Sequence, residues 1–341
     1  KNVDILIILD GWGFREETEG NAVAQANTPF LDSMINTYPN CKLLCSGNEV
    51  GLPEGTMGNS EVGHMNIGAG RRVFQDFVRI NNAIKDKTFF NNPALVDIMQ
   101  KVARSQKSLH LMGLLSDGGV HSHINHLFAL IDMAKQNQIE QLFIHPILDG
   151  RDTSPTSGFS YIKQLQDYLD KAGIGRIATI VGRYYAMDRD TRWDRVERAY
   201  QLFTVFTEGQ GVQFEKAVEA VRKSYDAGTT DEFVEPVFMV SKNRVGDMPQ
   251  GIITDGDGLI FFNFRADRAK EITRAFTQKD FSEFKRKKTP ELCGFVCMTR
   301  YDENFGLPVA FGPQHLSLIL GEILSQNNIR QLRIAETEKY A

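Results

Sequence analysis

The sequence predicts an α/β protein of two domains, each a mostly parallel sheet flanked by helices. The first indication is the length of 341 residues, which is long for one domain and comfortable for two. The second is the apolar run at residues 3–9, which ends in Asp10 and is typical of a strand buried on both faces of a parallel sheet. The third is a regular alternation of strand-like and helix-like segments after residue 92.

The elements are expected in the following order. Strands at 3–9 and 42–45 flank a helix that begins at Thr28-Pro29 and ends near residue 38. A connecting helix covers 73–84, and Asn92 caps a helix that ends near residue 104. The later strands are 108–115, 142–148, 176–181, 259–262, 292–298 and 330–335, and the later helices are 124–136, 155–172, 191–203, 267–277 and 314–326. Residues 209–258 are the least regular region, with one helix at 215–225 and long connections.

The composition is that of a soluble globular protein, with 42% hydrophobic and 24% charged residues. A formal net charge of −4 gives no reason to expect binding to nucleic acid or membrane, so an anion site must come from locally clustered arginines. The aliphatic run at 5–9 is too short to span a bilayer, and no signal-peptide cleavage pattern follows it. The four cysteines lack the spacing of a zinc site and are expected to be buried free thiols in a reducing cytoplasm.

Charged side chains follow four of the predicted strands at the points where those strands end. If the strands are parallel, their carboxyl ends meet at one edge of the sheet, where ligands of α/β proteins bind. Arg265 and Arg268 are three residues apart at a predicted helix start, which would place them on the same side. The residues concerned are His121, Arg151, Asp152, Arg183, Arg189, Arg265 and Arg268.

Five arginines at one sheet edge are expected to bind a small molecule with more than one anionic group, because guanidinium matches carboxylate and phosphate in a bidentate way. Taken singly, each arginine is better explained as a surface ion pair. His121 is a candidate phosphate ligand or proton donor, and a structural hydrogen bond is an equal alternative. Asp152 is a candidate general base for a substrate hydroxyl, with an ion-pair partner or turn residue as the alternative.

A glycine-rich run at 47–70 contains the tripeptide Gly58-Asn59-Ser60. Glycines allow a tight turn that exposes a serine hydroxyl, which suits a nucleophile activated by a base or a metal. A tripeptide is weak evidence, and an ordinary surface loop is the alternative. Asp10 is a candidate metal ligand at the end of the first predicted strand, with a turn-stabilising role as the alternative.

The longer run at 57–71, MGNSEVGHMNIGAGR, resembles the nucleophile segment of cofactor-independent phosphoglycerate mutases, a family of the alkaline-phosphatase superfamily. Residues 148–155, 182–193, 261–269 and 335–340 resemble further motifs of that family. The resemblance implies a phosphatase-like domain split between 1–74 and 308–341. It also implies an inserted phosphotransferase domain at 75–307 that binds the substrate.

The resemblance also implies an isomerase of glycolysis and gluconeogenesis that interconverts 3-phosphoglycerate and 2-phosphoglycerate without bisphosphoglycerate. Ser60 would carry the phosphoryl group as a phosphoserine, and Asp10 and Ser60 would bind one of two divalent metal ions, with Mn²⁺ as the expected identity. Asp152 would handle the proton of the accepting hydroxyl. A cytoplasmic monomer is expected. The implied phosphoglycerate ligands are His121, Arg151, Asp152, Arg183, Arg189, Arg265, Arg268 and Lys339.

The sequence departs from the family in its metal ligands. In the family, most of them are Asp and His residues well downstream of the Lys339 segment, whereas this sequence ends at Ala341 and has no histidine after His315. The metal site is therefore expected to be incomplete, and the 341 residues to be an inactive part of a longer protein. Two other hypotheses stay open: a metal-dependent phosphatase or sulfatase of the same superfamily, and a non-catalytic fragment that binds phosphoglycerate.

Overall fold

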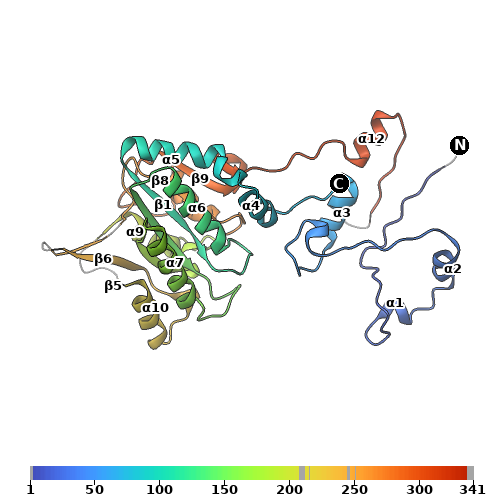
Figure 1. Ribbon diagram of the computed structural model, residues 1–341, viewed down its shortest axis with the longest axis horizontal. Helices are drawn as coiled ribbons and strands as arrows, with labels where there is room; N and C mark the ends of the chain where they lie inside the picture. Colours follow the sequence, from blue (N-terminus) through green and yellow to red (C-terminus); the bar gives the residue numbers. More distant parts are fainter. Residues whose placement is uncertain (1–2, 207–211, 215, 244–245, 250, 336–341) are drawn as a thin grey trace. The chain divides into compact units, whose positions relative to one another are not determined.

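A computed structural model describes residues 3–206, 212–214, 216–243, 246–249 and 251–335 (Figure 1). The chain divides into two compact units. We call residues 1–78 with 315–341 the terminal unit, and residues 79–314 the central unit. The predicted domain limits, at residues 74/75 and 307/308, differ slightly from these divisions and stay a prediction about domains.

The central unit contains one ten-stranded sheet, which confirms the predicted α/β class. Its order is β10-β9-β8-β1-β2-β4-β6-β5, with β3 beside β2 and β7 beside β6. The pairs are parallel except those of β6 with β4 and with β7. The strands are β1 (Ser108–Leu115), β2 (Gln141–Leu148), β3 (Arg176–Ile177), β4 (Thr179–Gly182), β5 (Val212–Phe214), β6 (Val237–Asn243), β7 (Gly246–Pro249), β8 (Gly258–Phe261), β9 (Gly294–Thr299) and β10 (Val309–Phe311).

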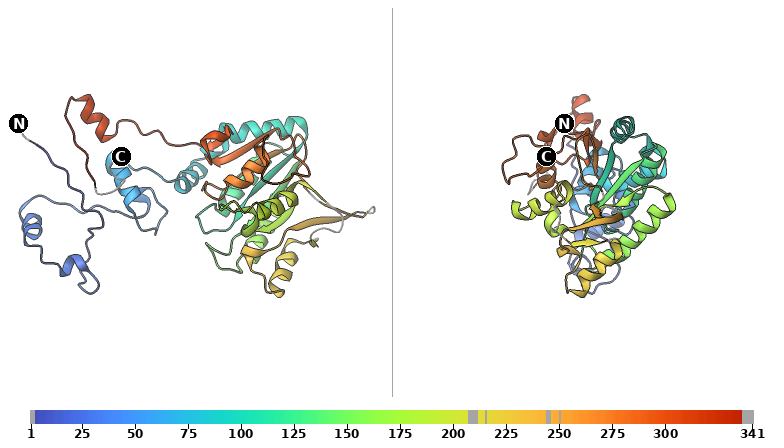
Figure 2. Two further views of the ribbon diagram at one scale, coloured as in Figure 1. Left: turned by 180° about the vertical axis from the view of Figure 1, so that it is seen from behind. Right: turned by 90° about the vertical axis from the view of Figure 1, so that its left-hand side faces the viewer.

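Helices cover both faces of this sheet (Figure 2). On one face α5 packs so closely on β8 that a Cβ at Gly258 would lie 2.6 Å from Val102 Cγ2. On the other face α9 and α11 bury Tyr200 and Phe276 against Met112 and other apolar strand residues. The helices that belong wholly to this unit are α5 (Pro93–Ser105), α6 (Ile124–Gln136), α7 (Gly158–Ala172), α8 (Arg183–Ala186), α9 (Trp193–Thr204), α10 (Ala217–Asp226) and α11 (Lys270–Thr277).

Several predicted elements of the central unit are confirmed. β1 and α6 have the predicted limits, and the Asn92 side chain caps α5 by accepting hydrogen bonds from two backbone amides. The prediction of long connections around the helix at 215–225 is wrong, because β5, β6 and β7 lie on either side of α10. β5 and β7 are short and give little apolar signal, whereas the apolar run at the start of β6 was the signal that the prediction missed.

The terminal unit contains helices and irregular segments. A small buried apolar cluster among its described residues consists of Val50, Leu52 and Val62. Its helices are α1 (Ala22–Gln25), α2 (Pro29–Thr37), α3 (Ser60–Ala69) and α12 (Leu320–Gln326), and α4 (Asp76–Lys85) crosses the division between the units.

The strands predicted at 3–9, 42–45 and 330–335 are wrong as local structure. The described residues of the terminal unit contain no strand, and Val3, Leu44 and Ile334 are 80%, 74% and 86% exposed. A strand requires a neighbour that takes up its backbone hydrogen bonds and a layer that covers its apolar side chains. The described part of this unit supplies neither of these.

The cysteine thiols also differ in burial between the terminal unit and the central unit. All four cysteines are free, as predicted, but only Cys297 is buried. Cys41 and Cys45 of the terminal unit are exposed, and Cys293 is half-buried, so the prediction of four buried thiols is wrong for three of them. Burial depends on a covering layer, which the local apolar sequence around Cys41 and Cys45 does not guarantee.

Candidate active site

The carboxyl ends of β4, β2, β1 and β8 lie side by side, because these strands are neighbours and run parallel. The loop that follows each strand therefore reaches the same edge of the sheet. The sequence-predicted residues on these loops lie close to one another. Arg183 Nη1 lies 2.6 Å from Asp152 Oδ2, and His121 Nε2 lies 3.8 Å from the same oxygen. The structure thus brings residues from three of the four loops together around one carboxylate.

The fourth loop joins the cluster through Asp267, which sequence reasoning did not single out. Its Oδ1 lies 3.7 Å from His121 Nδ1 and 3.0 Å from Arg265 Nε, and its Oδ2 lies 2.9 Å from Arg189 Nη1. Burial alone would raise the pKa of Asp267, but the hydrogen bond from Arg189 and the charges of Arg265 and His121 hold it below its ordinary value. The sequence signal that could have identified Asp267 is its position between Arg265 and Arg268.

A second organising residue that the sequence reasoning missed is Asp149, which is 1% exposed. Its Oδ1 accepts hydrogen bonds from the Arg151 and Asp152 amides at 3.2 and 3.0 Å and pairs with Arg183 Nη1 at 2.6 Å. Its Oδ2 accepts one from Ser116 Oγ at 2.7 Å. Burial opposes the ionised form, but these hydrogen bonds and Arg183 keep the pKa of Asp149 below its ordinary value. One buried carboxylate therefore orders the loops after β1, β2 and β4.

His121 is buried at the centre of the cluster, with 3% of its surface exposed. Burial lowers its pKa to about 4, and the charge of Arg183 contributes to the shift, although Asp267 and Asp152 oppose it. Its imidazole is therefore neutral near pH 7. Within the described residues its Nδ1 has no hydrogen-bond partner, so this ring offers a polar atom that a ligand can satisfy.

The remaining arginines differ in how they are held. The helix start predicted at Arg265 and Arg268 is wrong, because both precede α11: Arg265 lies in an irregular segment and Arg268 in a turn. Arg268 Nη1 donates to the Met187 carbonyl oxygen at 3.0 Å, and Arg151 lies 3.7 Å from Glu232. Burial lowers the pKa of Arg268, and the charges of Arg183, Arg189 and Arg151 lower it further. The guanidinium groups are thus close enough to repel one another, which favours a bound polyanion.

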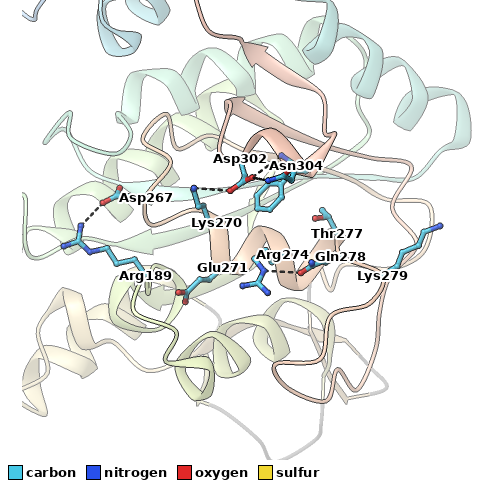
Figure 3. A pocket seen from close by; sticks show the side chains of 11 residues that line it. Arg189, Asp267, Lys270, Glu271, Arg274, Thr277, Gln278, Lys279, Asp302 and Asn304 are labelled. Atoms are coloured by element: carbon cyan, nitrogen blue, oxygen red, sulfur yellow. Dashed lines mark hydrogen bonds and ion pairs between the residues drawn. The ribbon is translucent and has the colours of Figure 1, made fainter. Parts of the chain in front are cut away.

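A cavity of about 580 Å³ adjoins the cluster (Figure 3). Arg189 and Asp267 lie at one end of it, and Lys270 and Arg274 of α11 line its wall. Lys270 pairs with Asp302 at 3.1 Å and Arg274 with Glu283 at 2.8 Å, so both cations already form ion pairs with carboxylates. The volume is sufficient for a small metabolite.

In the terminal unit, Ser60 and Asp10 meet although they are 50 positions apart in the sequence. The Ser60 hydroxyl donates to Asp10 Oδ2 at 2.6 Å. Ser60 is the first residue of α3, whose N-cap Asn59 accepts a hydrogen bond from the Val62 amide, so its placement in a glycine loop is corrected to a helix start. Gly58 is required here, since a Cβ would lie 1.8 Å from the Cys45 carbonyl oxygen.

The described residues do not form a complete metal site. Asp10 and Ser60 offer two oxygen ligands, and among the described residues no group of three or more His, Cys, Asp or Glu side chains could hold an ion. Six to eight oxygens surround Ca²⁺, and even zinc takes four ligands, so two are too few. Lys339 lies outside the described residues. No helix of the described part is both long and apolar enough to cross a bilayer.

The fold and the cluster together define an α/β protein with a group of arginines at the carboxyl edge of a mostly parallel sheet. The family model described as "BPG-independent PGAM N-terminus" matches residues 80–303. The chain therefore belongs to the family of bisphosphoglycerate-independent phosphoglycerate mutases, which confirms the resemblance noted from the motifs.

Relatives with the name 2,3-bisphosphoglycerate-independent phosphoglycerate mutase match nearly the whole chain. The protein of Syntrophotalea carbinolica is 56% identical over 98% of this chain and 64% of its own length. That of Methanococcoides burtonii is 52% identical over 99% of this chain and 64% of its own length. A solved structure of Leishmania mexicana phosphoglycerate mutase at low cobalt concentration has 34% identity and a TM-score of 0.70, over 94% of this chain and 59% of the other. The chain thus spans less than two thirds of the length of these relatives.

Proposed function

We propose that the central unit binds phosphoglycerate in the cluster of Arg151, Arg183, Arg189, Arg265 and Arg268 with His121 and Asp152. We further propose that the protein to which this chain belongs interconverts 3-phosphoglycerate and 2-phosphoglycerate through a phosphoserine on Ser60. The observation that carries the proposal is that His121, Arg183, Arg189 and Arg265 lie around Asp152 and Asp267 at one sheet edge. Phosphoglycerate has a phosphate and a carboxylate, which suits several guanidinium groups.

The proposed reaction has two phosphoryl transfers. In the first, Ser60 Oγ forms a bond to phosphorus while the bond from phosphorus to a glycerate oxygen breaks, and that oxygen takes up a proton. In the second, the other glycerate hydroxyl attacks the phosphoserine and restores the serine. Asp10 accepts the hydrogen bond of the Ser60 hydroxyl at 2.6 Å and is suited to take its proton. Asp152 is the proposed acceptor for the proton of the glycerate hydroxyl.

The arginine cluster accounts for isomerisation rather than hydrolysis. Between the two transfers the dephosphorylated glycerate must stay bound, because water would otherwise take the phosphoryl group. Arg183, which is buried and fixed by Asp149 and Asp152, is a rigid group for retaining a carboxylate. A phosphatase would have no use for such retention, so the mutase is favoured over the phosphatase or sulfatase hypothesis.

Further components of the proposal concern the complete protein. Two divalent ions, with Mn²⁺ as the proposed identity, would activate the serine and stabilise the charge on phosphorus, with Asp10 and Ser60 among the ligands. No bisphosphoglycerate is required. Lys339 is proposed as a further phosphoglycerate ligand, and the protein as a cytoplasmic monomer. Because the described residues supply too few metal ligands, we predict phosphoglycerate binding without turnover for the 341 residues.

Calorimetric titration of the 341-residue chain with 3-phosphoglycerate tests the binding proposal. Arg265→Ala and Arg183→Ala should each weaken binding at least about tenfold, since each removes charge-assisted hydrogen bonds to an anion. Arg104→Ala, in the last turn of α5, is the matched control and should bind normally. Equal affinity in all four proteins would refute the cluster as the binding site. Manganese-dependent mutase turnover by a verified 341-residue polypeptide would refute the prediction of inactivity.

Ser60→Ala in the complete protein tests the phosphoryl carrier. Turnover should fall by at least about 10⁴-fold, because the group that carries the phosphoryl is absent. The substrate affinity of the arginine cluster should be retained. Phosphate release that is faster than isomer formation in the unmodified protein would favour the hydrolase instead.

A further inference from the structure

The segment between α8 and α9 carries Arg189 and folds around a buried carboxylate. Asp188 is 3% exposed, and its Oδ2 accepts hydrogen bonds of 2.9 Å from the amides of both Asp190 and Arg192. Its Oδ1 lies 3.5 Å from guanidinium nitrogens of Arg192 and Arg195. Asp188 therefore fixes the backbone on both sides of the residue between those amides, Thr191. We call residues 188–192 the Arg189 turn.

Thr191 gives this turn an unfavourable backbone conformation. Its φ is +58°, in the left-handed region that a β-branched residue rarely adopts. Such a conformation persists when the surrounding structure holds it in place. The Thr191 amide donates a 2.9 Å hydrogen bond to Glu271 Oε1, 80 positions later in the chain. One contact therefore ties the strained residue to α11.

Glu271 lies in the first turn of α11, where a carboxylate is ordinarily favoured, but its side chain is buried, with 6% exposed. Figure 3 shows its side chain directed away from Lys270 and toward the segment that carries Arg189. Within the described residues its Oε2 accepts no hydrogen bond, and an ionised carboxylate oxygen without a donor would be costly at this depth. Helix packing alone would be served better by an apolar side chain of similar volume.

Protonation of Glu271, which the neighbouring carboxylate of Asp188 favours, removes this cost. Burial raises the pKa of Glu271, and the negative charge of Asp188 raises it further. The pKa of Asp188 is lowered, because the amides and guanidinium groups around it outweigh the effect of its burial. A proton on Glu271 Oε2 can be donated to Asp188, while Oε1 still accepts from Thr191. In this form one side chain joins α11 to both the carboxylate and the strained residue of the Arg189 turn.

We propose that Glu271 is a positioning residue for Arg189: its side chain fastens the Arg189 turn to α11 and so sets the place of the guanidinium group in the anion site. The inference rests on the proposed function, in which Arg189 is a phosphoglycerate ligand. Without ligand, the 2.9 Å pair of Arg189 with Asp267 also holds the turn. When a substrate anion replaces Asp267 as the partner of Arg189, that link is lost and the Glu271 link still holds the turn.

The test compares two substitutions of Glu271 in the 341-residue chain. Glu271→Gln retains an acceptor for the Thr191 amide and a donor for Asp188, whereas Glu271→Met fills a similar volume and retains neither. Glu283→Ala, which removes only the carboxylate partner of Arg274 near the same helix, is the matched control. Affinity for 3-phosphoglycerate is measured by calorimetry, and amide hydrogen exchange of the Arg189 turn is measured without ligand.

We expect Glu271→Met to weaken binding about tenfold and to accelerate exchange of the Thr191 amide, while Glu271→Gln and Glu283→Ala stay within about twofold of the unmodified chain. Arg189→Ala should remove the benefit of Glu271, so the double variant Arg189→Ala with Glu271→Met should bind no more than about twofold more weakly than Arg189→Ala. A rescue by glutamine distinguishes positioning from a general loss of packing.

Three results would overturn the inference: normal binding by Glu271→Met, loss of binding by Glu271→Gln equal to that of Glu271→Met, or effects that multiply in the double variant. Failure of the unmodified chain to bind 3-phosphoglycerate would instead refute the proposed function. In that case the exchange measurement still decides whether Glu271 holds the turn, because it requires no ligand. Unchanged exchange in Glu271→Met would refute that role as well.

Discussion

Two apolar segments of similar composition differ in their solvent exposure in this chain. Residues 3–9 of the terminal unit are exposed, with Ile5 at 74%, whereas β1 (Ser108–Leu115) of the central unit is almost entirely buried. The difference lies in their neighbours. β1 pairs along its whole length with β2 and also with β8, and helices cover both faces, while the described residues provide no partner strand for 3–9. An apolar run thus specifies a strand only together with the chain segments that cover it.

The two functional parts differ in the same way. The anion site lies on loops fixed by buried hydrogen bonds, above all those of Asp149. Ser60 and Asp10 meet through one exposed hydrogen bond. We therefore expect the central unit to be a stable binding module and the terminal unit to be the less stable region of the chain. One tryptophan in each, Trp12 and Trp193, allows the two to be followed separately.

The largest expected contrast concerns the thiols. Burial raises the pKa of Cys297 to about 12, so its thiolate fraction near pH 7.5 is about 10³-fold below that of an ordinary thiol. Cys41 and Cys45 are exposed. Labelling with a thiol-specific disulfide reagent should therefore modify these two at least about 10³-fold faster than Cys297, as read by peptide mass spectrometry. In strong denaturant all four should react alike, which is the control. Slow labelling of Cys41 and Cys45 in the native chain would contradict the contrast.

A smaller contrast is expected from matched leucine truncations. Leu111→Ala removes a side chain with 0% exposure and should lower the free energy of unfolding of the central unit by about 2–5 kcal/mol. Leu44→Ala changes an exposed residue of the terminal unit and should alter stability by less than about 0.5 kcal/mol. Urea unfolding is followed through Trp193 in a Trp12→Phe background, and through Trp12 in a Trp193→Phe background. Comparable costs for the two leucines would show that residues 42–45 are packed in solution.

The smallest effect per residue and per pH unit concerns the buried histidines. Burial lowers the pKa values of His110, His123 and His145, and lowers that of His121 to about 4 and that of His126 to about 3. Between about pH 6.5 and pH 4 the unfolded chain therefore binds protons that the folded central unit does not. The contribution of these histidines to the free energy of unfolding of the central unit should be fully present above pH 6.5. It should decrease as the pH falls, by about 1.4 kcal/mol per pH unit for each histidine.

Two groups oppose this slope, because burial raises the pKa values of Asp231 and Glu271, which bind protons in the folded state. Five histidines outweigh two carboxyls, so the net slope keeps its sign. The measurement is urea unfolding followed by Trp193 at several pH values, in the Trp12→Phe background. His121→Gln should reduce the slope of stability against pH by the contribution of one histidine, about 1.4 kcal/mol per pH unit. A stability that is constant from pH 6.5 to pH 4.5 would contradict the burial of these imidazoles.

By itself the sequence determined the α/β class, the limits of β1 and α6, the family, and which loops carry the side chains of the proposed anion site. These features depend on local periodicity, caps and contiguous motifs, which can be read along the chain. The roles of Asp149, Asp267 and Glu271 were decided only by the tertiary structure. Their partners, such as Arg183, Arg189 and Thr191, lie 34, 78 and 80 positions away. The exposure of residues 3–9 was likewise decided there, because burial depends on covering segments and a run of apolar residues does not specify them.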